Sequence, residues 1–267
     1  MSRPRPALTL VPALGVLLLT AACGSSSSGG GTASSPSTSG GLSGTVTVFA
    51  AASLKESFTA IGTAFEAAHP GVKVVFNFGP SSGLATSITS GNPADVFASA
   101  SPTTMDTVLK AGDVASPVTF AKNRMEIAVP ASNPARVKGV ADLARSGVKV
   151  TLCQAAVPCG KVAAQVFAKA GLTVTPISEE TDVKAVLTKV SLGEVDAGVV
   201  YVTDVLAAAA GGKVTGIEIP AAVNASTSYP IASLTKAPNP AGAAAFTAYV
   251  LSDQGRSALT TAGFAAP

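Results

Sequence analysis

The chain has no tryptophan, one histidine and only three cysteines among its 267 residues. A single imidazole, that of His69, cannot form the histidine clusters of zinc centres. This histidine also precedes the serine at position 81, whereas α/β-hydrolases place the histidine of their triad last. These shortages argue against a metalloenzyme and against a hydrolase, and we expect no enzymatic activity.

An excess of charge of one sign is also absent. The sequence has 18 Lys and Arg against 15 Asp and Glu, and removal of Arg3 and Arg5 with the leader leaves 16 against 15. A nearly neutral body argues against nucleic acid as a partner. The acidic residues are scattered, which disfavours a binder of free metal ions, since such sites use carboxylates.

The first residues have the pattern of a leader. Residues 1–22 combine Arg3 and Arg5 with an apolar run that is too short to span a membrane, and they predict a signal peptide. The segment 19–23, Leu-Thr-Ala-Ala-Cys, resembles the lipobox of bacterial lipoproteins, which implies lipidation of Cys23. Residues 23–41 are rich in Ser and Gly and predict a flexible tether. We expect an extracytoplasmic protein anchored to the outer face of the cell membrane; the alternative is an ordinary secretory signal.

The other two cysteines, Cys153 and Cys159, lie six positions apart in a Pro- and Gly-containing segment. Outside the cytoplasm, such a pair is typical of a disulfide. A metal site is the competing interpretation, but no other ligand cluster accompanies the two thiols. We therefore predict a disulfide.

Apolar runs that suit strands alternate with helical patterns along the rest of the chain. This alternation predicts an α/β fold with mostly parallel sheets flanked by helices. We expect two units with a cleft between them, the first formed by residues 42–122 plus 226–267 and the second by residues 123–225. The expected strands are 45–50, 72–78, 95–98, 125–129, 148–152, 198–201 and 229–234, and the expected helices follow Ser53 and cover 84–90, 104–111, 140–145, 161–170, 181–192, 203–209 and 241–251.

Small and neutral residues follow several expected strands. Ser53 comes after the strand 45–50 and three alanines, and with Glu56 it matches a capping box that opens a helix. Ser81 follows the second strand, and the turn 158–160 follows a strand of the second unit. Backbone N–H groups and helix dipoles at such junctions can bind an anion without a salt bridge. The sequence therefore predicts an oxyanion site made of neutral donors.

Two short motifs suggest catalysis and are interpreted as chance matches. Residues 79–83, Gly-Pro-Ser-Ser-Gly, fit the nucleophile elbow of α/β-hydrolases, and residues 233–236 fit Ser-x-x-Lys. Neither motif has its partner residues elsewhere in the chain. A serine-dependent extracytoplasmic hydrolase is therefore kept only as a weaker alternative.

An ordered series of segments resembles the periplasmic molybdate-binding proteins of ABC transporters. The segments are 46–54, 78–85, 91–100, 157–160, 180–183, 198–201 and 262–264. The resemblance implies a two-lobed periplasmic-binding-protein-like fold that closes on molybdate or tungstate and delivers it to an ABC permease. It further implies a monomer that needs no cofactor. Alternatives are a binding protein for another oxyanion such as sulfate, and the effector domain of a transcription regulator, which the signal peptide opposes.

The resemblance also implies a set of ligand-binding residues. Ser53 and Ser81 would each offer a hydroxyl and a backbone N–H, Cys159 and Val183 their backbone N–H groups, and Tyr201 its hydroxyl. Molybdenum would be held only as the oxyanion, through these residues. The alternative to Ser81 is its neighbour, Ser82. Without the resemblance, Tyr201 and Val183 would be interpreted as core residues.

Overall fold

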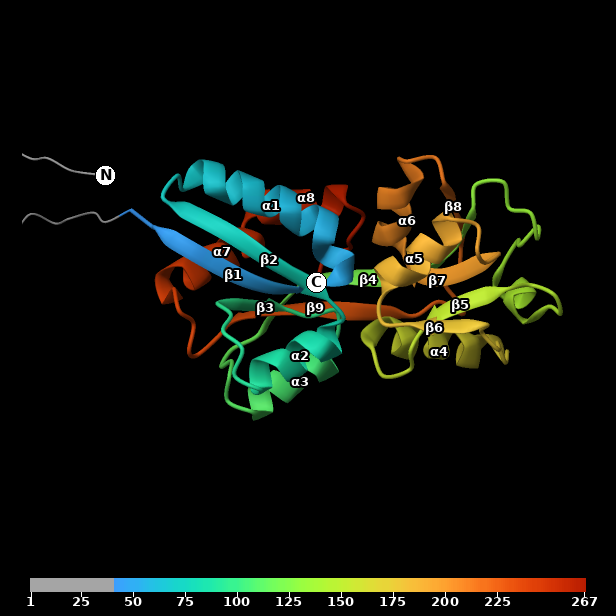
Figure 1. The fold of residues 1–267 in the computed structure, drawn as a ribbon, viewed down its shortest axis with the longest axis horizontal. Helices are drawn as coiled ribbons and strands as arrows, with labels where there is room; N and C mark the ends of the chain where they lie inside the picture. Colours follow the sequence, from blue (N-terminus) through green and yellow to red (C-terminus); the bar gives the residue numbers. More distant parts are fainter. Residues whose placement is uncertain (1–40) are drawn as a thin grey trace, which may run out of the picture. The chain divides into compact units, whose positions relative to one another are not determined.

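The computed structural model describes residues 41–267 (Figure 1). The predicted signal peptide 1–22, the lipidation site Cys23 and nearly all of the tether lie outside the described residues. No described helix is long and apolar enough to cross a membrane. The elements, in chain order, are β1 Gly44–Ala51, η1 Ala52–Leu54, α1 Lys55–Ala68, β2 Val72–Gly79, α2 Ser81–Thr89, β3 Val96–Ala98, α3 Pro102–Lys110, β4 Val118–Pro130, η2 Val140–Ala144, β5 Val150–Cys153, α4 Pro158–Ala170, β6 Ser178–Glu180, α5 Val183–Ser191, β7 Ala197–Tyr201, α6 Val202–Ala209, β8 Val214–Glu218, β9 Ser226–Ser233, α7 Pro240–Leu251 and α8 Asp253–Thr261.

The strands form a mixed sheet in the order β2-β1-β3-β9-β4-β7-β5-β6, with β8 paired to β4. β1 is parallel to β2 and β3, and β5 is parallel to β6 and β7. β4 and β9 run antiparallel to their neighbours and connect these two parallel groups. The predicted α/β fold is confirmed, with helices on both faces of the sheet (Figure 1).

Strand β4 explains why the sheet is mixed. Residues 118–124 pair with β9, and residues 125–130 pair with β7 and β8. The sequence analysis predicted a strand only from Met125, because the first half of β4 contains four polar residues, Thr119, Lys122, Asn123 and Arg124. One long strand therefore pairs with β9 through its first half and with β7 and β8 through its second half.

The apolar side chains gather in separate cores. One core contains residues between 125 and 225 together with Ala52, and another contains residues between 46 and 121 and between 229 and 264. A smaller cluster lies under α2 and α3. In the core around α1, Leu54, Phe58, Ile61 and Phe65 are buried, as expected for an amphipathic helix with one apolar face.

Some predicted boundaries are wrong. α2 begins at Ser81 rather than Leu84, and α4 begins at Pro158 rather than Lys161. Proline suits the first helical position because its missing N–H would have no partner there. The predicted helix 140–145 is the short 3-10 helix η2. β6, β8 and α8 were missed, since β6 is a polar three-residue strand and α8 buries only Gly255 and Leu259.

Candidate functional site

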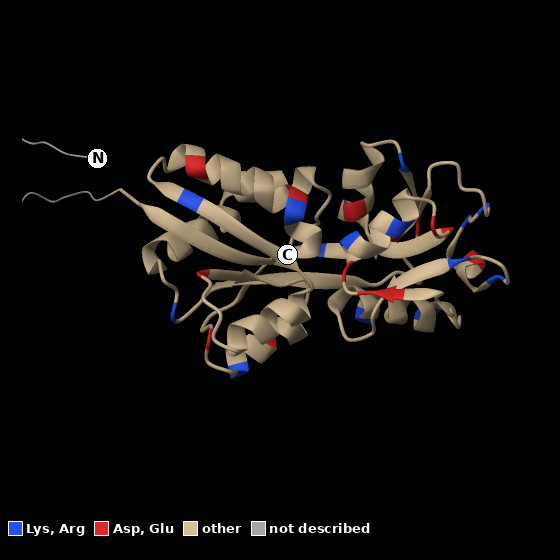
Figure 2. Cartoon of the chain, viewed as in Figure 1, with Lys and Arg blue, Asp and Glu red and all other residues tan. Residues whose placement is uncertain are grey.

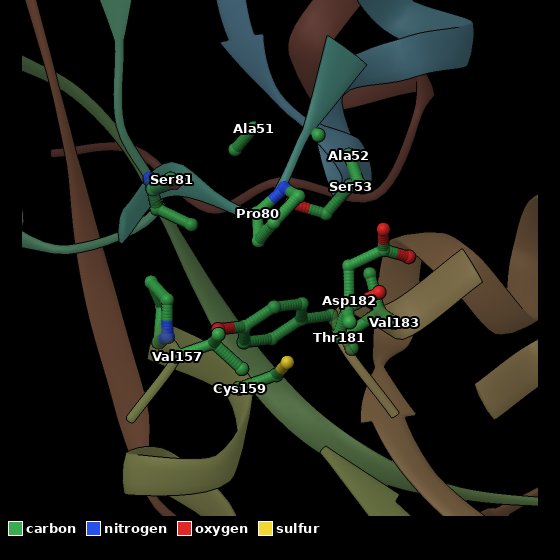
Figure 3. A pocket seen from close by; sticks show the side chains of 14 residues that line it. Ala51, Ala52, Ser53, Pro80, Ser81, Val157, Cys159, Thr181, Asp182 and Val183 are labelled. Carbon is green, nitrogen blue, oxygen red and sulfur yellow. Dashed lines mark hydrogen bonds between the residues drawn. The ribbon is translucent and has the colours of Figure 1, made fainter. Parts of the chain in front are cut away.

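A small cavity lies at the carboxyl ends of the six parallel strands β1, β2, β3, β5, β6 and β7. The space open to the centre of a water-sized sphere is about 20 Å³, a little more than the roughly 10–15 Å³ that one water molecule needs. The first parallel group contributes residues 51–53, 79–81 and 100, and the second contributes 157–159, 181–183 and 201. Figure 3 shows the labelled residues of the two groups on opposite sides of the cavity.

All five residues predicted to bind the ligand line this cavity, and each lies at the start of a helix. Ser53 lies in η1, Ser81 is the first residue of α2, Cys159 is the second residue of α4, Val183 is the first residue of α5, and Tyr201 is the N-cap of α6. The first N–H groups of a helix have no partner within the helix, and the helix dipole is positive there. The cavity therefore has a positive potential from backbone groups.

Ser53 does not cap a helix, so the predicted capping box is wrong. The chain first makes the 3-10 turn η1, which moves the start of α1 to Lys55, with Leu54 as its N-cap. The Ser53 side chain is buried, and its Oγ lies 2.8 Å from the hydroxyl of Tyr229. Glu56, the predicted partner in the box, instead pairs with Lys184. Ser53 and Glu56 thus contact residues that are distant in sequence instead of each other.

Ser81 also has a defined partner. Its Oγ accepts a hydrogen bond from the buried backbone N–H of Ala100 at 3.0 Å. The hydroxyl hydrogen remains available for another acceptor, because a hydroxyl can accept and donate at once. Ser82 is partly buried and does not line the cavity. The structure therefore brings Ser81, rather than Ser82, to the cavity.

The turn before Cys159 is held by a covalent bond. Cys153 and Cys159 form the predicted disulfide, with their Cα atoms 5.7 Å apart. The Gln154 carbonyl accepts the N–H of Val157 at 3.1 Å. Gly160 packs so closely on this turn that a Cβ there would collide with the Gln154 carbonyl. These contacts fix the start of α4, where the Cys159 N–H lies.

At the start of α5, Asp182 acts as the N-cap. Its carboxylate accepts the N–H groups of Lys184 at 2.8 Å and Ala185 at 3.0 Å, which leaves the Val183 N–H outside these bonds. Glu180 lies just before this helix and does not take part in the cap. Glu180 ends β6, and a hydrogen bond from Lys189 lowers the pKa of its carboxyl.

Tyr201 differs from the other residues that line the cavity in the state of its side chain. Its hydroxyl is buried and has no hydrogen-bond partner among the described residues. An unpaired buried donor is costly and rare in a native protein. Burial raises the pKa of the Tyr201 phenol well above its usual value, and neighbouring Tyr229 and Asp204 raise it further. The phenol is therefore a protonated donor at physiological pH.

Comparison with known proteins identifies the family. Residues 46–265 match the bacterial extracellular solute-binding proteins. The chain belongs to this family. Among its relatives, the molybdate-binding protein ModA of Mycobacterium tuberculosis (strain ATCC 25618 / H37Rv) is 46% identical over 224 residues, which cover 84% of this chain and 85% of the relative. The resemblance noted in the sequence is confirmed.

Two solved structures show the same fold. The periplasmic molybdate-binding protein of Azotobacter vinelandii aligns with a TM-score of 0.74 and 20% identity, over 83% of this chain and 99% of that chain. The sulfate-binding protein SubI of Mycobacterium tuberculosis H37Rv aligns with a TM-score of 0.73 and 21% identity, over 82% and 86%. Since both molybdate- and sulfate-binding proteins share it, the fold alone does not identify the anion.

No Lys or Arg lines the cavity of this solute-binding protein. Positive and negative residues are interspersed over the described part of the chain (Figure 2). Lys184 follows the cavity residue Val183 in sequence, and it pairs with Glu56 at 2.7 Å and Asp204 at 2.9 Å. Burial raises the pKa of Asp204, while Lys184 opposes this shift. Lys184 thus joins α1 of the first parallel group to α5 and α6 of the second.

The sequence analysis missed Tyr229, Lys184 and Asp204. Tyr229 was identified only as the start of a strand, and its proximity to Ser53 depends on a contact across 176 positions. No local pattern could indicate that contact. Among the described residues, no group of three or more His, Cys, Asp or Glu side chains is placed to hold a metal ion.

Proposed function

We propose that this solute-binding protein captures molybdate, and also tungstate, outside the cytoplasm and delivers it to an ABC permease. The observation that carries the proposal is the convergence of Ser53, Ser81, Cys159, Val183 and Tyr201 on one small cavity. The name of the relative that is 46% identical, a molybdate-binding protein, supports molybdate as the ligand. The protein acts as a carrier without turnover or cofactor.

The donor set favours a fully deprotonated tetrahedral oxyanion. The proposed ligands are hydroxyls and backbone N–H groups, which all donate hydrogen bonds. The carboxylate of Asp182 also lines the cavity, and its Oδ1 accepts two backbone N–H groups of α5. A protonated phosphate carries a hydrogen that the five proposed donors cannot bind, so it should make fewer hydrogen bonds with them than a fully deprotonated anion. Sulfate differs from molybdate mainly in size, so cavity size must separate these two anions.

We further propose that the two cores act as lobes. Residues 42–122 and 226–267 would form the first lobe and residues 123–225 the second, with β4 and β9 as the connecting strands. Support comes from the separate apolar cores and from the position of the cavity between the two parallel groups. Lipidation of Cys23 would keep the monomeric protein near its permease on the outer face of the membrane.

Titration calorimetry of the anion-stripped protein with molybdate, tungstate, sulfate and phosphate tests the proposed ligand. We expect one anion per chain, with molybdate and tungstate bound similarly and at least tenfold more tightly than sulfate, or about 1.4 kcal/mol. Phosphate should bind most weakly. Equal affinity for sulfate and molybdate, or tighter binding of sulfate, would overturn the assignment.

A further inference from the structure

Tyr229 touches the site without lining the cavity. It lies on β9 and is fully buried, and its hydroxyl oxygen lies 2.8 Å from Ser53 Oγ. Its ring packs edge-on against Phe120, Tyr201 and Phe264 at centroid distances of 6.3, 6.1 and 5.3 Å. Aromatic contacts on three sides fix the position of the phenol behind Ser53.

The hydrogen bond between the two hydroxyls can run in either direction, and its surroundings decide between them. If Ser53 donates, its hydrogen is used by the Tyr229 oxygen and is not available to the cavity. If Tyr229 donates, the hydrogen left over belongs to Ser53, which lines the cavity. Only the second direction leaves the Ser53 hydrogen free for an acceptor in the cavity.

We propose that Tyr229 is a positioning residue that donates to Ser53 and thereby turns the Ser53 hydrogen into the cavity. The inference rests on the proposed function, because a bound oxyanion is the acceptor for that hydrogen. Burial raises the pKa of the Tyr229 phenol, so it keeps its proton at physiological pH.

The other serine of the site has the same arrangement. Ser81 Oγ accepts the N–H of Ala100, a donor whose direction cannot reverse. Its own hydrogen is therefore also left for the cavity. Both serines thus have a donor behind them, a backbone amide for Ser81 and a tyrosine for Ser53. The tyrosine can be changed by mutation, whereas the amide cannot.

A double-mutant cycle with Tyr229→Phe and Ser53→Ala tests this role in the full-length protein. Tyr229→Phe removes one oxygen and keeps the ring, and we expect molybdate affinity to fall about five- to tenfold. In the Ser53→Ala background, the same change should cost nothing further, because its effect passes through Ser53. Tyr249→Phe, on the partly buried Tyr249 that does not line the cavity, is the matched control and should leave affinity unchanged.

An unchanged affinity in Tyr229→Phe, or an equal loss with and without Ser53, would overturn the proposal. A second measurement needs no ligand. Without anion, Ser53→Ala should lower the melting temperature more than Tyr229→Phe, since it removes the oxygen to which the buried Tyr229 hydroxyl donates, and adding Tyr229→Phe should recover part of that loss. The opposite order of melting temperatures would show that Ser53 is the donor. If wild-type protein fails to bind molybdate, the proposed function fails, while the melting temperatures still decide the direction of the bond.

Discussion

The two sides of the cavity supply the same kind of donor by different means. The side formed by β1, β2 and β3 offers the hydroxyls of Ser53 and Ser81, each already bonded to a second group. The side formed by β5, β6 and β7 offers the helix starts at Cys159 and Val183 and the unpaired hydroxyl of Tyr201. Each serine hydroxyl therefore has one partner without ligand, whereas the buried Tyr201 hydroxyl has none among the described residues.

Because of this difference, a substitution can remove the side-chain donors, whereas it can only shift the position of the backbone donors. A serine hydroxyl can be removed by substitution to alanine. A backbone N–H remains after any substitution except one to proline. Mutation can therefore change only the contacts that hold this part of the backbone in place. For the second side these contacts are the Cys153–Cys159 disulfide and the Asp182 cap.

Ser81→Ala should have the largest effect. It removes one donor to a charged ligand, worth about 1.5–3 kcal/mol, or roughly ten- to a hundredfold in affinity. It also leaves the buried Ala100 N–H without a partner, which should lower stability by about 1–3 kcal/mol. Calorimetry and chemical denaturation measure the two effects. Ser82→Ala, one position along and outside the cavity, is the matched control and should change neither.

Tyr201→Phe should separate affinity from stability. The phenol has no partner without ligand, so its removal should leave the melting temperature of the ligand-free protein unchanged or higher. Affinity for molybdate should fall about tenfold, because the donor to the anion is lost. A drop in the stability of the ligand-free protein with no loss of affinity would make Tyr201 a core residue only.

Reduction of the disulfide should weaken binding by loosening one side of the cavity. The closed loop is short, so the expected loss of stability is about 2–3 kcal/mol. The turn before Cys159 must then be ordered when the anion binds, and we expect a severalfold loss of affinity. A Cys153→Ser, Cys159→Ser double variant should behave like the reduced protein, and Cys23→Ser is the matched control. A loss of stability with unchanged affinity would restrict the bridge to a structural role.

The ion pair between Glu56 and Lys184 should contribute less. It joins the two sides at 2.7 Å, but Glu56 is about half exposed, and such pairs are typically worth 0.2–1 kcal/mol. Glu56→Gln should therefore reduce affinity by no more than about fivefold, and less at high salt. Glu218→Gln removes the exposed pair with Arg124, away from the cavity, and should have no effect on binding. Equal losses in both variants would exclude a specific role for the pair.

The pH should have the smallest effect on binding. The donors are neutral hydroxyls and backbone amides, so molybdate affinity should stay constant between about pH 6 and 9. Burial raises the pKa of Tyr201 and Tyr229 above 10.0, and the unfolded chain therefore loses these protons first as the pH rises. Their contribution to stability is complete below pH 10 and is lost above it. An affinity that falls between pH 6 and 9 would indicate an ionisable ligand group.

Much of this site could be predicted from sequence, because it depends on local order. A strand, a small-residue turn and a helix start occur together in the chain, and this pattern located Ser53, Ser81 and the turn at Cys159. The roles of Tyr201 and Val183 came only from the resemblance to a family. The partners of Ser53 and Glu56 could not be predicted, since Tyr229 and Lys184 are 176 and 128 positions away.

The surroundings of Tyr201 and the pairing of β4 also depend on contacts between distant segments, which the sequence does not indicate. Tyr201 ends β7, and its burial gives no sign in the sequence of whether its hydroxyl has a partner. The long strand β4 was recognised only in part, because its pairing with both β9 and β7 is a property of the whole sheet.

A crystal structure of the protein grown with molybdate tests the central claim most directly. We predict one anion in the cavity, with its oxygens within hydrogen-bond distance of the hydroxyls of Ser53, Ser81 and Tyr201 and of the N–H groups of Cys159 and Val183. No lysine or arginine should contact it. An anion bound elsewhere, or one held in the cavity by a cationic side chain, would contradict the account.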